Sequence, residues 1–320
     1  MHDLVYLQMQ ATPGLGNSYI RRILEHFSHT NEDLLDFIER HFKETKRLDL
    51  LEKFISAKST ALRWYDLINK SNYTLVSINS KLYPERLKRV LGTDAPPILY
   101  FWGNLHLLHQ PSIGFCGSRK VSTKGLSVAE DTSYQIALKN WVVVSGHAKG
   151  VDTATHQTAL FNKGKTIIVS PEGVLCFKIR SDIKYLIDLD NTLIVSEFQP
   201  NSAWSVSNAM TRNHTICGLS DALIVIQSGL EGGTFQAGKY ALNKRVPLFV
   251  ADYEDAVHHD APGNSYFLKN GASRIGKSVE TQKANLNHLI REVEIHHGLI
   301  SKPEKGERYI QDKLFADLPF

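Results

Sequence analysis

The chain has 320 residues, of which 42% are hydrophobic and 22% charged, a balance typical of a globular protein and not of a disordered or fibrous one. The net charge of +4 permits a polyanionic partner without requiring one. Neither a CxxC pair nor an HExxH spacing occurs, so we expect reduced thiols, no metal and no cofactor. Because no signal peptide or membrane span is recognisable, the sequence predicts a cytoplasmic protein without a membrane partner.

The first part of the chain has a helical texture. Apolar residues recur at helical spacing through residues 1–75, which predicts a small all-helical domain. The glycine turn within it resembles those of SAM or helix-hairpin-helix modules. The segment TPGLG (12–16) predicts a tight turn between the first two helices. Such a turn can offer backbone N–H groups to a phosphate, but we favour an ordinary interhelical turn. Residues 76–111 are rich in proline, and we expect a connector with short strands that packs on the core.

From 112 to 280 short apolar segments alternate with helical patterns. The segments are β-branched and apolar, as strands covered on both faces must be, and they are 112–116, 141–145, 166–170, 193–196, 222–226 and 246–250. The helical patterns between them are 124–139, 153–162, 178–188, 206–218 and 234–243. This rhythm predicts an α/β fold with a doubly wound, mostly parallel Rossmann-like sheet. The tail 281–320 is expected to be helical and is too short for a full winged helix.

The first candidate site follows the opening strand of this sheet. Ligands of such a sheet bind beyond the carboxyl ends of the strands, where helix N-termini point. Gly117, Ser118 and Arg119 offer there a close backbone approach, a hydroxyl and a forked guanidinium donor. The turn is not GxGxxG, and no acidic residue ends the second strand, so a dinucleotide site is disfavoured. A structural turn with a surface arginine is the alternative.

The second candidate site lies between the second strand and its helix. Ser145, Gly146 and Lys149 are predicted to contact a ligand. Asp152 is expected to cap the helix, with His156 one turn further on and within its reach, and we interpret both as architectural. An Asp–His pair also suggests general-base chemistry. Since no nucleophile is evident nearby, we predict no catalytic residue.

The remaining candidates flank the strand 222–226. Arg212 lies in the helical pattern before it, where a surface arginine would be unremarkable, and Gly232, Gly233 and Thr234 follow it. Thr234 as an N-cap would expose the free N–H groups of a new helix, which is an anion site. A glycine-rich turn is common for packing reasons alone. Four such loops at one edge of a sheet favour phosphate binding.

Several long motifs in a consistent order resemble the DNA-processing protein A (DprA/Smf) family. They are YPERLKRVLGTDAPPILYFWGNLHLL (83–108), GFCGSRKVSTKG, SGHAKGVDTATHQTAL, SEFQP, TRNHTICGLSDALIVIQ and GNSYFLKNGASRI. The resemblance covers residues 83–275 closely. It implies an extended Rossmann-like domain that binds and protects single-stranded DNA and helps load a RecA-type recombinase, in natural transformation or a related defence role. It also places phosphate contacts at Gly117, Ser118, Arg119, Lys149, Arg212 and Asn213. A homodimer is left open.

Two departures from the family pattern bear on the alternatives. The family's FPxRNR block reads AMTRNH here, without its aromatic residue and second arginine, which argues against base stacking at that position; Trp204, close in sequence, is the candidate substitute. The rival function is a LOG-like nucleotide phosphoribohydrolase, whose PGGxGTxxE signature supplies a catalytic glutamate. Gln236 stands in that place and cannot act as a base, so we predict a protein that is not an enzyme. A nucleotide-sensing module is the third reading.

Overall fold

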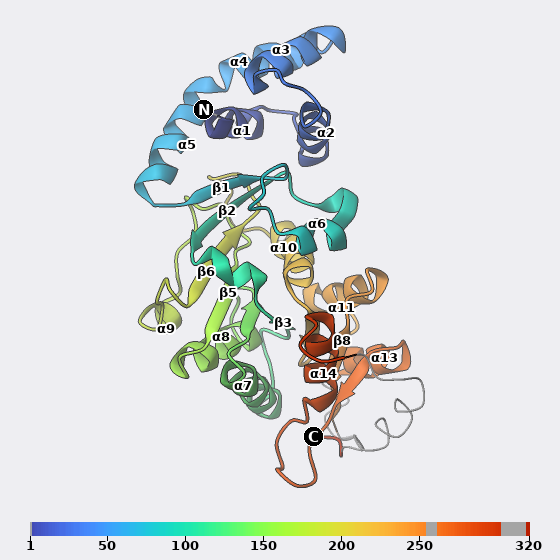
Figure 1. Cartoon of the computed structure of the whole chain (residues 1–320). Coiled ribbons are helices and arrows are strands. Elements are labelled where there is room, and N and C mark those ends of the chain that lie inside the picture. The colour runs from blue at the N-terminus through green and yellow to red at the C-terminus, as the bar shows by residue number, and fades with distance from the viewer. Residues whose placement is uncertain (1, 254–260, 302–317) are drawn as a thin grey trace. The chain divides into compact units, whose positions relative to one another are not determined.

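The computed structural model describes residues 2–253, 261–301 and 318–320. Nine strands form one sheet in the order β1-β2-β6-β5-β4-β3-β7-β8-β9 (Figure 1). The strands are β1 (Thr74–Ser77), β2 (Ile98–Gly103), β3 (Ser112–Cys116), β4 (Val142–Ser145), β5 (Lys165–Val169), β6 (Thr192–Ser196), β7 (Ala222–Val225), β8 (Leu248–Ala251) and β9 (Ser273–Ile275). The pairs β3–β4, β4–β5, β3–β7, β7–β8 and β8–β9 are parallel, and β1–β2 is antiparallel. The predicted α/β fold with a mostly parallel sheet is confirmed.

Helices precede and connect these strands. They are α1 (His2–Ala11), α2 (Asn17–Phe27), α3 (Leu34–Glu44), α4 (Leu48–Ser56), α5 (Lys58–Lys70), α6 (Glu85–Leu91), α7 (Thr123–Leu138), α8 (Val151–Phe161), α9 (Ser181–Lys184), α10 (Val206–Leu219), α11 (Gly233–Asn243), α13 (Pro262–Lys269) and α14 (Asn287–His296), with the short 3-10 turns η1 (Gly92–Asp94) and η2 (Leu105–His109). None of the described helices is both long enough and apolar enough to span a membrane.

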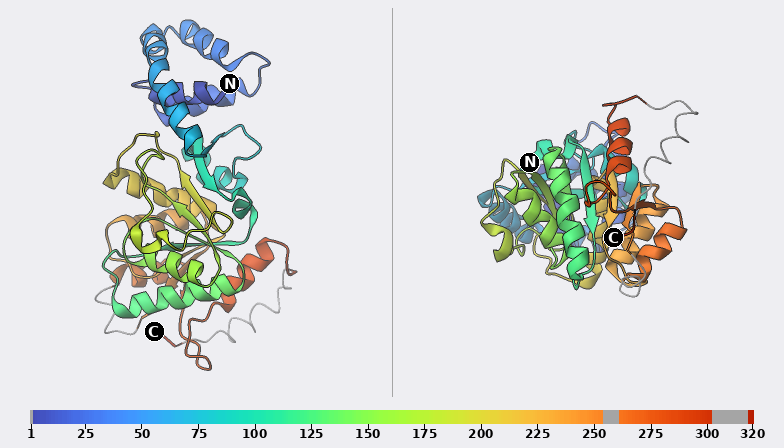
Figure 2. Two further views of the ribbon diagram at one scale, coloured as in Figure 1. Left: turned by 90° about the vertical axis from the view of Figure 1, so that its left-hand side faces the viewer. Right: turned by 90° about the horizontal axis from the view of Figure 1, so that it is seen from below.

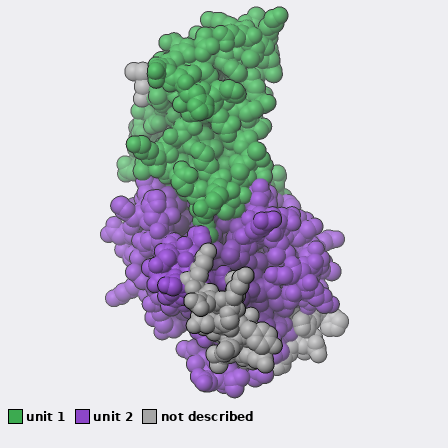
Figure 3. Space-filling model, turned by 45° about the vertical axis from the view of Figure 1, so that its right-hand side comes forward, with its two compact units in different colours: residues 1–102, 170–178, 194–208 green, residues 103–169, 179–193, 209–320 purple. Residues whose placement is uncertain are grey.

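The chain divides into two compact units (Figure 3). Unit 1 comprises residues 1–102, 170–178 and 194–208, and unit 2 comprises 103–169, 179–193 and 209–320. Unit 1 contains the five N-terminal helices, in which the buried Gln8 amide donates to the Phe54 carbonyl oxygen at 2.7 Å. The predicted TPGLG turn joins α1 to α2, and Gly14 takes a φ of +86° there, which favours glycine.

The core of unit 2 follows the period-two alternation of its strands. Side chains such as Ile113, Phe115 and Ile224 point to one face, where they pack with Val128 of α7 and Leu289 of α14. Helices α7 and α8 lie side by side (Figure 2). The intervening strand residues point to the other face. Every residue of β3, β4 and β7 is buried, so both faces of these strands are covered, and the strands therefore read as continuous apolar segments in the sequence.

One of the predicted helices is wrong. Residues 178–188 were expected to form a helix, but only Ser181–Lys184 do so. At the C-terminal end of the predicted span, the Asp188 carboxylate accepts a hydrogen bond from the Asp190 N–H at 3.0 Å, a local side-chain contact that stabilises a turn there. The other predicted strands and helices agree with the structure within one or two residues. The tail is helical over α14, and residues 302–317 lie outside the described part.

The packing of α7 gives a test of this core. Ile136 is fully buried and Leu138, two residues further on, is 66% exposed. We expect Ile136→Ala to lower the free energy of unfolding by about 2–5 kcal/mol, because it leaves a cavity against the sheet. Leu138→Ala should change it by no more than about 0.5 kcal/mol. Urea unfolding of the two variants measures the difference, and equal losses would contradict the placement of α7.

Candidate functional site

The sheet reverses its winding direction at β3. This strand lies between β4 and β7. From β3 the chain adds β4, β5 and β6 on one side, and it then crosses over to add β7, β8 and β9 on the other side. In open α/β sheets such a switch point creates the crevice in which ligands bind. The loops 117–119, 145–150 and 229–234 all leave the carboxyl ends of these neighbouring strands, and we call them the phosphate face.

Two of the predicted loops pack directly on each other. Gly150 has a φ of +80°, and a Cβ built there would lie 2.5 Å from the Ser118 carbonyl oxygen and 2.9 Å from that of Arg119. A Cβ on Gly117 would overlap Val151 at the start of α8. Both glycines are therefore required by close backbone packing. Because these two turns are in contact, the exposed residues Arg119 and Lys149 lie on adjoining turns.

Gln227 joins the loops after β3 and β7, although none of the sequence patterns singled it out. Its carbonyl oxygen accepts from the Ser118 N–H at 2.9 Å, and its Oε1 accepts from the Ser122 N–H at 2.9 Å. The side chain is buried. A glutamine directly after an apolar strand was the available signal, because a buried amide needs partners of this kind. Gln227 therefore fixes the start of α7 and the turn that carries Arg119.

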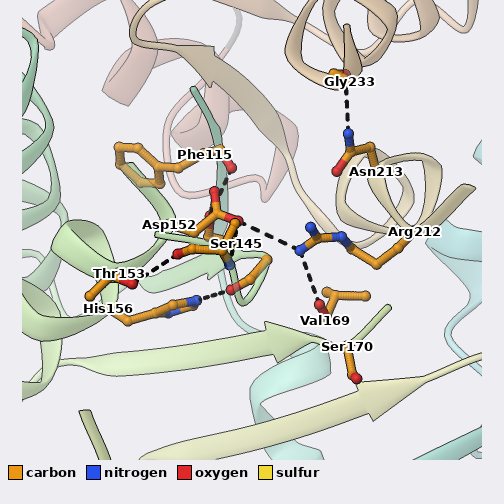
Figure 4. A network of polar contacts seen from close by, with 12 residues as sticks. Phe115, Ser145, Asp152, Thr153, His156, Val169, Ser170, Arg212, Asn213 and Gly233 are labelled. Carbon is orange, nitrogen blue, oxygen red and sulfur yellow. Dashed lines mark hydrogen bonds and ion pairs between the residues drawn. The ribbon is translucent and has the colours of Figure 1, made fainter. Parts of the chain in front are cut away.

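A buried ion pair lies beneath these loops (Figure 4). Arg212 and Asp152 are 4% and 7% exposed, and the Arg212 Nη1 lies 3.7 Å from Asp152 Oδ2. Nη1 also donates to the Val169 carbonyl oxygen at 3.1 Å. Asp152 in turn accepts from Ser145 Oγ at 3.1 Å and from the Ala148 N–H at 3.2 Å. The ends of β4 and β5 and the start of α8 are thus held by one charge pair.

The predicted capping role of Asp152 is wrong. Gly150 is the N-cap of α8, and the Asp152 side chain turns inward to Ser145, Ala148 and Arg212 because these groups supply the donors that a buried carboxylate needs. Its architectural role remains. Gly146 belongs to the same arrangement, since a Cβ at this position would overlap the Arg212 guanidinium.

Burial favours the neutral form of the two histidines near this site. Burial lowers the pKa of His156, whose Nε2 donates to the Gly146 carbonyl oxygen at 2.7 Å. His156 also contacts Thr166 Oγ1 through Nδ1, and its hydrogen bonds are made to these two groups in place of the expected partner Asp152. Burial lowers the pKa of His147 to about 3, and its Nε2 accepts from the Arg180 N–H. The exposed cations at these two turns are therefore Arg119, Lys120 and Lys149.

The last loop presents the start of α11. Gly232, with a φ of +88°, is the N-cap, so the expectation that Thr234 caps this helix is wrong; Thr234 is the second residue of α11. Asn213 on α10 donates from Nδ2 to the Gly233 carbonyl oxygen at 3.1 Å (Figure 4). Gly232 is exposed, and Gly233 and Thr234 are half-buried. The first N–H groups of α11 therefore lie near the surface, where an anion can reach them.

The predicted site residues fall into two groups by burial. Those at or near the surface are Gly117, Ser118, Arg119, Lys149, Gly232, Gly233 and Thr234. Those that are buried or nearly so are Ser145, Gly146, Arg212 and Asn213. The structure brings the surface group together along one edge of the sheet. It places the second group beneath, in contact with protein atoms.

Comparison with known proteins gives a consistent result. The family model described as DNA recombination-mediator protein A matches residues 74–289. The DNA processing protein DprA of Streptococcus pneumoniae is 29% identical over 268 residues, which cover 77% of this chain and 88% of that protein. Protein Smf of Escherichia coli is 28% identical over 255 residues, which cover 79% of this chain and 65% of that protein.

Solved structures agree with the sequence relatives. The crystal structure of DNA processing protein A from Streptococcus pneumoniae has a TM-score of 0.71 and 27% identity, and the match covers 85% of this chain and 93% of that one. A structure of the Helicobacter pylori protein, which concerns its mode of binding single-stranded DNA, has a TM-score of 0.55 and 25% identity over 63% of this chain and 90% of that one.

The packing of the first two loops predicts that two glycines of the phosphate face differ in how well they tolerate a side chain. Gly150→Ala should lower the free energy of unfolding by about 1–3 kcal/mol from backbone strain alone, and by more from the overlap with Ser118. Gly229→Ala is the matched control, because a Cβ there meets nothing closer than 3.9 Å, and it should change stability by no more than about 0.5 kcal/mol. Thermal or urea unfolding compares them. Equal tolerance of both changes would show that the loops do not pack as described.

Proposed function

We propose that this chain, which belongs to the DNA recombination-mediator protein A family, binds single-stranded DNA at the phosphate face. The observation that carries the proposal is the convergence of Arg119, Lys149 and the start of α11 on the edge where the sheet reverses its winding. A guanidinium fork, an ammonium group and free helix N–H groups are the donors that bind phosphate oxygens. The Helicobacter pylori relative, whose structure concerns its single-stranded DNA binding mode, supports the same class of ligand.

The proposed site has a surface layer and a supporting layer. Arg119, Lys149 and the backbone N–H groups of residues 232–234 contact the DNA backbone. Arg212 and Asp152 act as positioning residues, because a buried cation already paired with a buried carboxylate has little charge left for a phosphate. Ser145 likewise donates inward to Asp152. These buried groups set the loop geometry that the surface donors need.

The proposed biological role follows from the same ligand. A protein that covers the phosphates of a single strand protects it and can present it to a recombinase. The family's description as a recombination mediator supports a role in assisting the loading of a RecA-type recombinase. We propose that the chain performs no chemistry of its own in this role.

The cationic character of the face predicts a strong dependence on salt. Arg119→Ala should weaken binding to a labelled single-stranded oligonucleotide by about 1.5–3 kcal/mol, the scale of a charged hydrogen bond. It should also reduce the slope of log K against log salt by about 0.7 for each phosphate that the variant no longer neutralises. Arg119→Lys should recover only part of the affinity, because an ammonium group lacks the planar fork. Fluorescence anisotropy at several salt concentrations measures all three effects.

The control for this experiment removes a cation elsewhere in unit 2. Lys163 is exposed at the opposite end of α8 from Lys149 and has a φ of 56°, which asparagine tolerates. Lys163→Asn should leave both affinity and salt slope close to those of the parent. An equal decrease in affinity in Lys163→Asn and Arg119→Ala, or a parent protein that prefers duplex, would contradict the proposed site.

A nucleotide phosphoribohydrolase is the rival function. Gln236 lies on α11 two residues after Thr234, where the glutamate of that enzyme family would stand, and its side chain is exposed. An exposed neutral amide neither takes a proton nor stabilises the positive charge that develops when a glycosidic bond breaks. The adjacent start of α11 can still hold a phosphate.

We therefore expect nucleoside monophosphates to bind weakly and to remain intact. Purified protein is incubated with each monophosphate, and chromatography measures the release of free base. Gln236→Glu should yield at most a trace of release, because the buried network supplies no second catalytic group. Clear turnover by the parent, abolished in Gln236→Ala, would establish the rival reaction.

A further inference from the structure

Three potential metal ligands from distant parts of the sequence meet in unit 2 near the amino ends of β3 and β7. His296 Nδ1 lies 3.1 Å from Asp221 Oδ1, and His297 Nε2 lies 2.9 Å from Asp221 Oδ2. The ligand atoms of all three residues lie within 4.8 Å of one another. The imidazoles come from His296, the last residue of α14, and from His297, its C-cap, and the carboxylate comes from the residue before β7.

This cluster is separate from the phosphate face. Asp221 precedes β7, and its backbone N–H donates to the carbonyl oxygen of Ser112, the first residue of β3, at 2.7 Å. The cluster therefore lies at the amino ends of the two strands whose carboxyl ends carry the phosphate face. A ligand bound here does not contact DNA held there.

The Asp221 carboxylate is built into the protein more firmly than an exposed acid would be. Its side chain is 1% exposed, and Oδ2 accepts from the Ser112 N–H at 2.8 Å. A buried carboxylate is costly unless cations or donors surround it, and a hydrogen bond from the backbone fixes its orientation. His297 and His296 are 25% and 49% exposed, which leaves a path for an ion and for water to reach the cluster.

We propose that Asp221, His296 and His297 bind a divalent transition-metal ion, Zn²⁺ in the first place. Two imidazole nitrogens and one carboxylate oxygen are a common ligand set for Zn²⁺, with water in the fourth position of the tetrahedron. In the protein without metal, a proton lies between each imidazole nitrogen and the carboxylate oxygen that it contacts. On binding, the metal ion replaces these protons, which are released to solvent. A small separation of the three side chains makes room for it.

The ion acts as a cross-link that holds α14 on the sheet. Leu289 and Val293 of this helix are already buried in the core of unit 2, and Glu294 pairs at 2.8 Å with Lys139, the C-cap residue of α7. A metal at the last turn fixes the end of the helix to the starts of β3 and β7. Because the ion binds the folded arrangement, it stabilises unit 2 by mass action.

The test uses the full chain after removal of metal with a chelator. Titration with Co²⁺, followed by Zn²⁺ competition, should give one site per chain with the visible absorption bands of tetrahedral Co²⁺. Zn²⁺ should also raise the melting temperature. His296→Ala/His297→Ala should weaken binding by more than about 100-fold, beyond the effect of removing an outer partner of a metal site, and should abolish the thermal shift.

A matched pair of histidines provides the control. His106 and His109 lie three residues apart on η2 in unit 2, both are exposed, and neither belongs to the cluster of Asp221, His296 and His297. The variant His106→Ala/His109→Ala should keep the Co²⁺ spectrum and the thermal shift of the parent. Asp221→Asn gives a second test that leaves both imidazoles in place, and it should weaken Co²⁺ binding while circular dichroism confirms the fold. Absence of the tetrahedral spectrum in the parent, or its retention in His296→Ala/His297→Ala, would overturn the proposal.

Discussion

The pairing of Asp152 with Arg212 is the constraint on which the phosphate face depends. Neither charge is stable alone in the interior, because each loses its hydration there. Together they draw the end of β4, the end of β5 and the start of α8 to one point. Gly146 must lack a side chain for the guanidinium to reach this point. The turn that follows then brings Lys149 to the surface beside Arg119.

The division between buried and exposed charges has a functional meaning. A neutral buried pair gives rigidity and adds little to the field outside, whereas Arg119 and Lys149 set the local positive potential. Burial lowers the pKa of both neighbouring histidines and so favours their neutral forms. In the proposed function, contact with DNA is electrostatic and tolerant of sequence, because phosphates and not bases are bound.

Much of the fold could be predicted from local pattern. Strands such as Ser112–Cys116 are short and apolar, and glycines follow them in the turns, so periodicity located the sheet and the loops of the proposed binding edge. The helix expected at 178–188 was wrong; at its C-terminal end the turn contact of Asp188 is a local side-chain effect that periodicity does not include. The parts of the site that were missed depend on long-range contacts. Asp152 follows a strand end as an N-cap would, and only the buried Arg212, 60 residues later in the sequence, shows why its carboxylate turns inward. Asp221 likewise meets His296 and His297 only in the folded chain.

Hydrogen exchange with and without a single-stranded oligonucleotide tests the central claim most directly. If one phosphate face binds the strand, the amides of residues 117–120, 146–150 and 229–234 should exchange more slowly together in the complex. The amides of residues 104–110 and 162–165, at the other end of the same strands and helices, should not change. Protection confined to a single loop, or centred on residues outside these three loops while the oligonucleotide is bound, would contradict the account.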